Sequence, residues 1–276
     1  MNKNIKYFLI TLIVSLPLWW WLNVFTANLT DLFYYHEINY NSRILSAQAS
    51  QLAFEENIRN LKPVRNAKIP SLALDSKSAV SLLVDNQGQG RTLFNKAIDQ
   101  PLPIASLSKL MTALVVLKNY DLAKEIRISK EAVGQEENLG KLTVGETLLV
   151  EHLLYPLLME SSNDAAFALA NDYDGMDEKT FVGLMNLTAQ ALGLKNTHFI
   201  NVTGLDPEDS AEINYSSARD LTLLAQELLE SSLIRQILST HKINLYGPEL
   251  INTNEFLGRI SGVIGGKTGF TDKALG

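Results

Sequence analysis

The segment PIASLSKLMTAL, residues 103–114, constrains the fold of this chain more than any other stretch. Between Leu107 and Leu117 apolar side chains fall on nearly every face of a helix, which is typical of a buried helix. Lys109 lies in this segment, and a buried amine costs free energy unless something compensates it. One interpretation lets Lys109 extend out of the core at the helix start. The other places its amine on Ser106, because positions three apart share a helical face.

A second apolar segment stands at the N-terminus. Residues 7–25 carry no charge, and as a helix they would span roughly 30 Å, the hydrocarbon core of a bilayer. Lys3 and Lys6 precede this segment, and three tryptophans at 19–21 would form an aromatic belt at its far interface. We therefore expect residues 1–27 to be an uncleaved membrane anchor, with the rest of the chain outside the cytoplasm. The alternative is a cleaved signal peptide, for which residues 24–27 are a poor cleavage site.

The remaining chain divides into a linker and one domain. Residues 28–71 are polar and mixed, and we interpret them as a stalk with a short helix over 42–61. Residues 78–98 predict two strands joined by a turn that contains glycine, and residues 106–240 have helical spacing throughout. Strand-like residues return in HKINLYG and SGVIGGKTGFT. Residues 72–276 therefore predict an α+β domain, with an antiparallel sheet from both chain ends and an all-helical middle.

Composition excludes several classes of function. The net charge is −6 and the pI is near 5.3, so the chain lacks the excess of basic residues typical of a nucleic-acid-binding protein. The chain has no cysteine, which excludes disulfides, thiol catalysis and thiolate metal sites. Its four histidines are widely spaced, so we expect neither a metal site nor a cofactor.

Three short motifs could carry chemistry together. Ser-x-x-Lys alone is a weak signal, and a second copy at Ser239–Lys242 falls where a helix gives way to a strand. The copy at residues 106–109 opens an apolar helix, whose N-terminus favours developing negative charge. Ser161-x-Asn163 follows in a polar break between two helices, and Lys-Thr-Gly follows at residues 267–269.

A serine nucleophile needs a base, and Lys109 is the available group beside Ser106. Lowering the pKa of a lysine from about 10.4 to near 7 costs about 4 to 5 kcal/mol. Burial and a second positive charge both act in that direction. The apolar helix supplies the burial, and Lys267 could supply the charge.

Ser-x-x-Lys, Ser-x-Asn and Lys-Thr-Gly in this order resemble the signature of penicillin-binding proteins and serine β-lactamases. PIASLSKLMTAL, LLYPLLMESSNDAAFALA, NVTGL, YSSARDL and GGKTGFTD each resemble the D-alanyl-D-alanine carboxypeptidases, over residues 72–276. The resemblance implies a β-lactamase/transpeptidase-like fold and an enzyme that removes the terminal D-alanine of peptidoglycan stem peptides. It also implies an acyl-enzyme on Ser106 and inhibition by β-lactams.

The resemblance assigns further roles to the motif residues. Ser161 relays a proton to the leaving amine, and Asn163 hydrogen-bonds the substrate backbone. The third motif binds the substrate's terminal carboxylate and lets the peptide lie against it as an added strand; its residues are Lys267, Thr268 and Gly269. The backbone N–H groups of Ser106 and Phe270 form the oxyanion hole, in which each donor contributes about 3 to 4 kcal/mol.

Other functions on the same motifs stay open. A DD-endopeptidase, a β-lactamase and a membrane-tethered penicillin or cell-wall sensor without turnover are the alternatives, and a glutamate motif for fast deacylation is missing. A nucleotide-binding loop is excluded, because Gly-x-x-x-x-Gly-Lys-Thr requires a glycine at Ser261. The chain departs from the family at Ser162, where these carboxypeptidases usually carry glycine.

The ending KTGFTDKALG also departs from the family. By resemblance, two strands and a helix should follow Lys-Thr-Gly, and those strands should lie between it and the N-terminal hairpin. Unpaired strand edges within a core are unstable. We therefore interpret the domain as truncated at its C-terminus, without its last strands and helix. We expect the chain as given to fold poorly or be inactive, and an extended version to be active.

Overall fold

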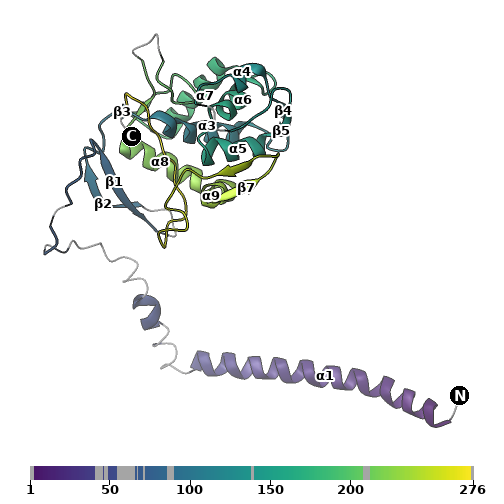
Figure 1. Ribbon diagram of the computed structural model, residues 1–276. Helices are drawn as coiled ribbons and strands as arrows, with labels where there is room; N and C mark the ends of the chain where they lie inside the picture. Colours follow the sequence, from purple (N-terminus) through teal and green to yellow (C-terminus); the bar gives the residue numbers. More distant parts are fainter. Residues whose placement is uncertain are drawn as a thin grey trace. The chain divides into compact units, whose positions relative to one another are not determined.

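The protein was analysed as a computed structural model, which describes residues 3–40, 46, 49–54, 66, 68–70, 72–85, 90–137, 140–207 and 212–274. The chain forms two compact units, Met1–Ser71 and Leu72–Gly276 (Figure 1).

The first unit is dominated by one long helix, α1 (Lys3–Tyr40), with Pro17 in its interior. Within it, residues 11–33 are long and apolar enough to cross a membrane, and none of that window is buried. The side chains of Trp19, Trp20 and Trp21 are all more than half exposed. Of the helix predicted over 42–61, residues 46 and 49–54 are described and are helical, and the others lie outside the described residues.

The second unit contains the helices and strands that position the site (Figure 1). Its helices are a 3₁₀ turn η1 (Ala105–Leu107), α3 (Ser108–Asn119), α4 (Lys130–Val133), α5 (Val150–Met159), α6 (Asn163–Asn171), α7 (Glu178–Ala191), α8 (Ala218–Leu229) and α9 (Ser232–Ser239). Its strands are β1 (Ala79–Val84), β2 (Gly90–Lys96), β3 (Leu102–Pro103), β4 (Glu125–Arg127), β5 (Thr147–Leu149), β6 (Tyr215–Ser216), β7 (Lys242–Asn244) and β8 (Glu249–Ile251). The predicted α+β class is confirmed.

The sheet arrangement differs from the prediction. The described strands form four two-stranded antiparallel sheets, β1–β2, β3–β6, β4–β5 and β7–β8. The predicted single sheet from both chain ends is therefore not formed. The physical reason is local: β7 and β8 are close in sequence and pair with each other, and residues 262–271, all of them described, are in no strand. The strand predicted at SGVIGGKTGFT is thus wrong.

Helix α3 lies at the centre of the core, as its sequence predicts, and contacts α5, α6, α7 and α8. Met111, Ala113, Val115 and Val116 on this helix have no exposed surface. Full burial of a side chain of this size stabilises the fold by about 1.5 to 3 kcal/mol. The segment that carries Ser106 therefore leads directly into a helix that is fixed on several sides by the core.

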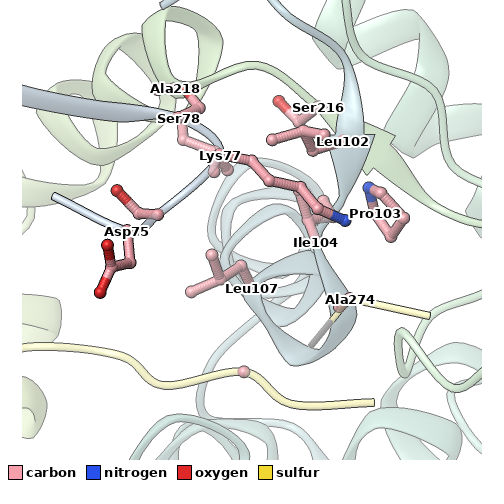
Figure 2. Close-up of a pocket in the computed structure, with 13 residues that line it drawn as sticks. Asp75, Lys77, Ser78, Leu102, Pro103, Ile104, Leu107, Ser216, Ala218 and Ala274 are labelled. Atoms are coloured by element: carbon pink, nitrogen blue, oxygen red, sulfur yellow. The ribbon is translucent and has the colours of Figure 1, made fainter. Parts of the chain in front are cut away.

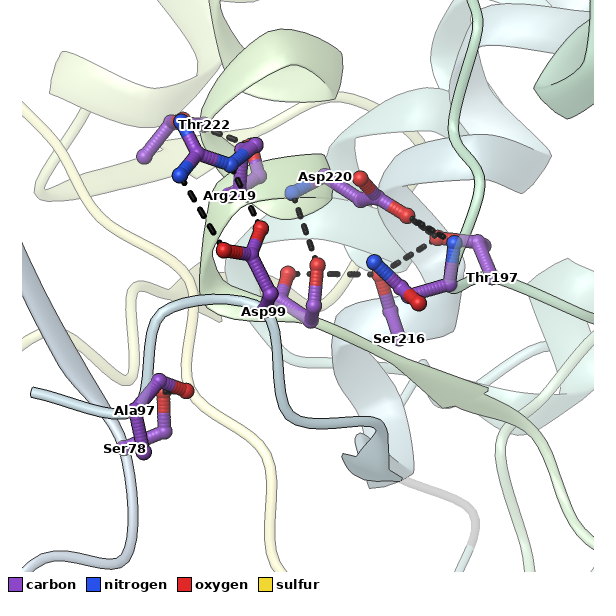
Figure 3. A network of polar contacts seen from close by, with 10 residues as sticks. Ser78, Ala97, Asp99, Thr197, Ser216, Arg219, Asp220 and Thr222 are labelled. Carbon is purple, nitrogen blue, oxygen red and sulfur yellow. Dashed lines mark hydrogen bonds and ion pairs between the residues drawn. The ribbon is translucent and has the colours of Figure 1, made fainter.

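Serine caps four of the helices in this unit, α4, α6, α8 and α9. Ser217 Oγ accepts from the N–H of Asp220 at 3.2 Å at the start of α8. A polar network extends from this start (Figure 3). The Asp220 carboxylate accepts from Thr197 Oγ1 at 2.8 Å, and the Arg219 guanidinium pairs with Asp99. These contacts tie α8 to the segment before β3, which leads directly to Ser106.

The backbone just before Ser106 is strained. Ala105 has a φ of 46°, a region that costs a residue with a Cβ about 1 to 2 kcal/mol. Gly204, with a φ of 86°, is packed so closely against this turn that an added Cβ would lie 2.0 Å from the Ala105 carbonyl oxygen. Only glycine fits there.

We predict that Gly204→Ala destabilises the protein by about 2–4 kcal/mol, because it combines an unfavourable φ with a backbone overlap. The control is Gly193→Ala, whose glycine has a φ of 71° but nothing within 4 Å of the added Cβ. That variant should lose about 1 kcal/mol. Urea unfolding of the chain in detergent, followed by circular dichroism, measures both. Equal losses would show that the close packing against Ala105 contributes nothing.

Candidate active site

Ser106 and Lys109 are in contact at the start of the central helix. Ser106 lies in η1, Lys109 lies in the first turn of α3, and the Lys109 Nζ is 2.9 Å from the Ser106 Oγ. The same amine donates to the carbonyl of Thr203 at 2.6 Å. Lys109 has no exposed surface. Of the two interpretations of Lys109, the structure therefore shows the contact with Ser106, and the amine does not extend to solvent.

Two effects lower the pKa of Lys109 well below its ordinary value. Burial of the amine is the larger, and the positive charge of Lys267 adds to it, while Glu137 and Asp164 act in the opposite direction. Both lowering effects disfavour the ammonium form. Lys109 thus contacts a hydroxyl by a hydrogen bond and has a lowered pKa that favours its neutral form. Both properties are required of a general base.

The second serine of the site contacts the second lysine. Ser161 follows α5 and has a φ of 63°, and its Oγ is 2.8 Å from the Nζ of Lys267. Burial lowers the pKa of Lys267 to about 7. The structure therefore brings Ser161 and Lys267 together across 106 residues of sequence. An unfavourable φ in a residue with a side chain typically persists at functional positions.

Asn163 is buried at the first position of α6, with 2% of its surface exposed. Its Nδ2 donates to the carbonyl of Glu136 at 2.7 Å. Its Oδ1 has no hydrogen-bond partner among the described residues. Buried acceptors are normally paired, so this oxygen is free to accept from a ligand.

The Lys-Thr-Gly segment lies against the Ser106 turn, although it forms no strand. A Cβ added to Gly269 would lie 3.2 Å from the Ser106 backbone nitrogen, so a glycine here permits a close approach. Thr268 Oγ1 is 3.2 Å from Thr253 Oγ1. The Phe270 side chain is 66% exposed, and the oxyanion-hole role of its N–H stays a prediction.

Several residues that join the three motifs escaped the sequence analysis. Thr253 links the second and third motifs, since its N–H donates to the Met159 carbonyl at 2.9 Å while its hydroxyl contacts Thr268. The buried carboxylate of Glu160 accepts from the N–H of Ile251 and from Lys141, both at 3.0 Å. Thr203 and Gly204 lie in NVTGL, which the resemblance marked without giving a role. Only that marking could have found them, because their contacts are to backbone.

Hollows flank the Lys-Thr-Gly segment on two sides. A cavity of about 380 Å³ between residues 75–78, β3 and α8 includes Gly269 in its wall (Figure 2). A larger one of about 730 Å³ is lined by Thr203 and Phe270 together with acidic side chains at 136, 137, 178, 206 and 272. The segment that carries the third motif is therefore accessible from both sides.

The second copy of Ser-x-x-Lys has no such geometry. Ser239 ends α9 and its hydroxyl donates to the Gln236 carbonyl, whereas Lys242 opens β7 and pairs with Glu249 at 3.2 Å. A helix end followed by a strand separates the two side chains, as the sequence predicts.

The site combines Ser106 on the buried amine of Lys109 with a second pair, Ser161 and Lys267, from two other segments. This combination defines the penicillin-binding class of serine acyl-transfer proteins. Residues 65–275 match the family described as D-alanyl-D-alanine carboxypeptidase, Peptidase_S11. The chain belongs to this family.

Curated relatives and solved structures agree with this assignment. A D-alanyl-D-alanine carboxypeptidase of Bacillus subtilis is 36% identical over 74% of this chain and 53% of its own length. A D-alanyl-D-alanine carboxypeptidase of Streptomyces sp. (strain K15) is 35% identical over 70% and 72%, and a D-alanyl-D-alanine endopeptidase of Pseudomonas aeruginosa is 36% identical over 70% and 64%. The chain thus spans about half to seven tenths of the length of these relatives.

Among solved structures, a mutant of the Streptomyces DD-transpeptidase superposes with a TM-score of 0.65 at 33% identity, covering 74% of this chain and 84% of that one. A D-alanyl-D-alanine carboxypeptidase from Mycobacterium tuberculosis gives 0.66 at 29% identity, covering 77% and 80%. The predicted β-lactamase/transpeptidase-like fold is therefore confirmed.

We predict that the free energy of unfolding rises with pH between about pH 7 and 9.5. A lysine with a depressed folded pKa binds fewer protons than the unfolded chain between that pKa and its ordinary value. For Lys267 this range starts at about 7, and the slope approaches about 1.4 kcal/mol per pH unit for each such lysine. Urea unfolding at several pH values should show a smaller slope in Lys267→Met. Lys118→Met, at an exposed ion pair, is the control, and an unchanged slope in Lys267→Met would contradict the prediction.

Proposed function

We propose that the chain is the catalytic part of a serine-type D-Ala-D-Ala carboxypeptidase, which removes the terminal D-alanine of peptidoglycan stem peptides. The observation that carries the proposal is the 2.9 Å contact between the Ser106 hydroxyl and the buried amine of Lys109. Family membership supplies the substrate class, and β-lactams, whose amide resembles the D-Ala-D-Ala bond, should acylate the same serine.

Acylation starts at Ser106. Its Oγ attacks the carbonyl carbon of the penultimate D-alanine while Lys109 takes the hydroxyl proton. The start of the central helix favours the negative charge that develops on the carbonyl oxygen. The backbone N–H groups of Ser106 and Phe270 would donate to that oxygen.

The leaving group departs on the opposite side of the site. Ser161 Oγ gives a proton to the amine nitrogen of the terminal D-alanine and takes in its place the proton that Lys109 removed from Ser106, so Lys109 is neutral again before deacylation. Lys267, 2.8 Å from the Ser161 Oγ, orients that hydroxyl. The C–N bond breaks and the acyl-enzyme remains. A water molecule, deprotonated by Lys109, then attacks the ester carbon and releases Ser106 and the shortened peptide.

Substrate recognition uses the unpaired and cationic groups of the site. Asn163 Oδ1 would accept from a substrate amide N–H, which satisfies its buried oxygen. The substrate's terminal carboxylate would lie at Lys267 and Thr268. A carboxylate there favours the charged form of Lys267, whose pKa of about 7 makes this form easy to reach.

A DD-endopeptidase is the second candidate function, because a relative named D-alanyl-D-alanine endopeptidase is 36% identical to this chain. The chemistry is the same, and only the peptide on the leaving side differs. Release of D-alanine from a diacyl-D-Ala-D-Ala peptide, compared with cleavage of cross-linked dimers, separates the two. A sensor without turnover would be acylated by penicillin yet release no D-alanine.

We also propose that residues 1–27 anchor the protein in the cytoplasmic membrane and that residues 28–71 are a stalk. The apolar window at 11–33 is long enough for an anchor. The tryptophans at 19–21 lie near the middle of this window, so they do not mark its far interface as the sequence predicted. Basic residues at 3 and 6 favour a cytoplasmic N-terminus, and the catalytic domain would then face the cell wall, where its substrate is.

We predict that Ser106→Ala abolishes labelling by a fluorescent penicillin and lowers D-alanine release at least about 10³-fold. Labelling is followed on gels, in the chain as given and in a C-terminally extended version. Ser239→Ala, in the second Ser-x-x-Lys copy, is the matched control and should label like the wild type. Label retained in Ser106→Ala would remove Ser106 from the mechanism.

We predict that an N-terminally tagged protein expressed in bacteria stays in the membrane fraction with its tag intact, because an anchor is not cleaved. Removal of residues 1–40 should release the domain into the soluble fraction. Blotting of the separated fractions for the tag measures both outcomes. Loss of the tag in the mature protein would establish a cleaved signal peptide instead.

A further inference from the structure

A buried asparagine between β6 and the loop at residues 200–205 has a fully used side chain. Asn214 has 3% of its surface exposed. Its Oδ1 accepts from the N–H of Ile200 at 2.7 Å and of Asn201 at 3.2 Å, and its Nδ2 donates to the Asn201 carbonyl at 2.9 Å. The same Nδ2 donates to Ser108 Oγ at 2.8 Å. One amide therefore joins the loop to the first turn of α3.

Two hydrogen-bonded paths lead from this side chain, one to each of the two reacting groups. We propose that Asn214 is a positioning residue, which holds the Thr203 carbonyl on Lys109 and the backbone turn before Ser106 in place at the same time. The inference rests on the proposed function, and it adds to that function a residue outside the three motifs.

The first path runs through the loop to the base. The Asn201 side chain, which Asn214 also contacts at 3.2 Å, accepts from the N–H of Gly204 at 2.7 Å. This contact closes the loop around Thr203, whose carbonyl accepts from the Lys109 amine at 2.6 Å. The carbonyl is a neutral acceptor in a dry site, and it favours the protonated amine.

The charges that act on the Lys109 amine come from three other elements. Lys267 acts from the third motif, Asp164 from α6, and Glu137 from the segment after α4. None of these groups contacts Asn214 in the hydrogen bonds of the described residues. A change at Asn214 therefore reaches Lys109 through the Thr203 carbonyl and leaves the neighbouring charges in place.

The second path runs through Ser108 to the nucleophile. The Ser108 hydroxyl, which accepts from Asn214, donates to the carbonyl of Ala105 at 2.7 Å. Ala105 is the residue with positive φ directly before Ser106. A strained turn persists only when its surroundings determine it, and the same carbonyl is contacted by the Ser108 hydroxyl and closely approached by Gly204.

The test compares Asn214→Leu and Asn214→Ser with the wild type in acylation by fluorescent penicillin, over a range of pH. We expect the maximal rate to fall about 10- to 100-fold, because a misplaced nucleophile reacts slowly. We also expect the acid limb of the pH profile to move down by about one pH unit, because a Lys109 without its carbonyl acceptor loses its proton more easily. Ser108→Ala should lower the rate without moving this limb.

The control is Asn186→Leu. Asn186 makes the same kind of pair with the backbone of Phe199, donating at 2.8 Å and accepting at 3.0 Å, and neither group contacts residues 201–204. It should keep the wild-type acid limb. Circular dichroism establishes that each variant is folded.

The inference is overturned if a folded Asn214 variant keeps both the acid limb and the acylation rate of the wild type. In that case labelling of the wild type still supports the proposed function. The inference is also overturned if the Asn214 variants and Asn186→Leu lose the same amount of acylation rate and none of them shifts the acid limb. That result would show that Asn214 has only a structural role. If neither Asn214 variant folds, an unchanged rate in Ser108→Ala has the same consequence. A wild type that takes no label, as given or C-terminally extended, overturns the function and the inference together.

Discussion

The structure of the catalytic domain depends on the burial of one amine. Lys109 has no exposed surface and stands in a buried helix of the domain, so its charged form is costly there. In the proposed function this cost has a use, because the neutral amine would be the form that accepts a proton from Ser106. The contact with the Thr203 carbonyl orients the amine, and Lys267 adds a positive charge near it.

The three motifs come from different parts of the chain and are held together by backbone contacts. Thr253 bonds the carbonyl of Met159 and the hydroxyl of Thr268, which fixes the second motif beside the third. Gly204 packs against the Ala105 carbonyl, which fixes the loop that bears Thr203 beside the first. Positive φ values at Ala105 and Ser161 show that two of the three motifs are held in backbone conformations they would not adopt alone.

Prediction from sequence succeeded where the signal is local. The buried central helix, the β1–β2 hairpin and the contact between Ser106 and Lys109 all follow from the spacing of residues that are close in sequence. It failed for the strand expected at Lys267, because a strand exists only where a partner pairs with it. It also gave no role to Asn214 or Thr253, since their partners, among them Ser108 and Thr268, lie outside the few residues over which spacing carries a signal.

The sequence by itself determined the chemistry of this protein: which hydroxyl and which amines are present, their order, and the apolar helix that removes one amine from water. Those properties follow from residue identity and helical periodicity, which act over one or two turns. Only the tertiary structure decided how the loop at 200–205, the Ser161 turn and the segment at 264–272 meet around Ser106. The physical reason is that these contacts are made by carbonyls and glycine backbone, which every sequence contains and which only packing can bring within hydrogen-bond distance.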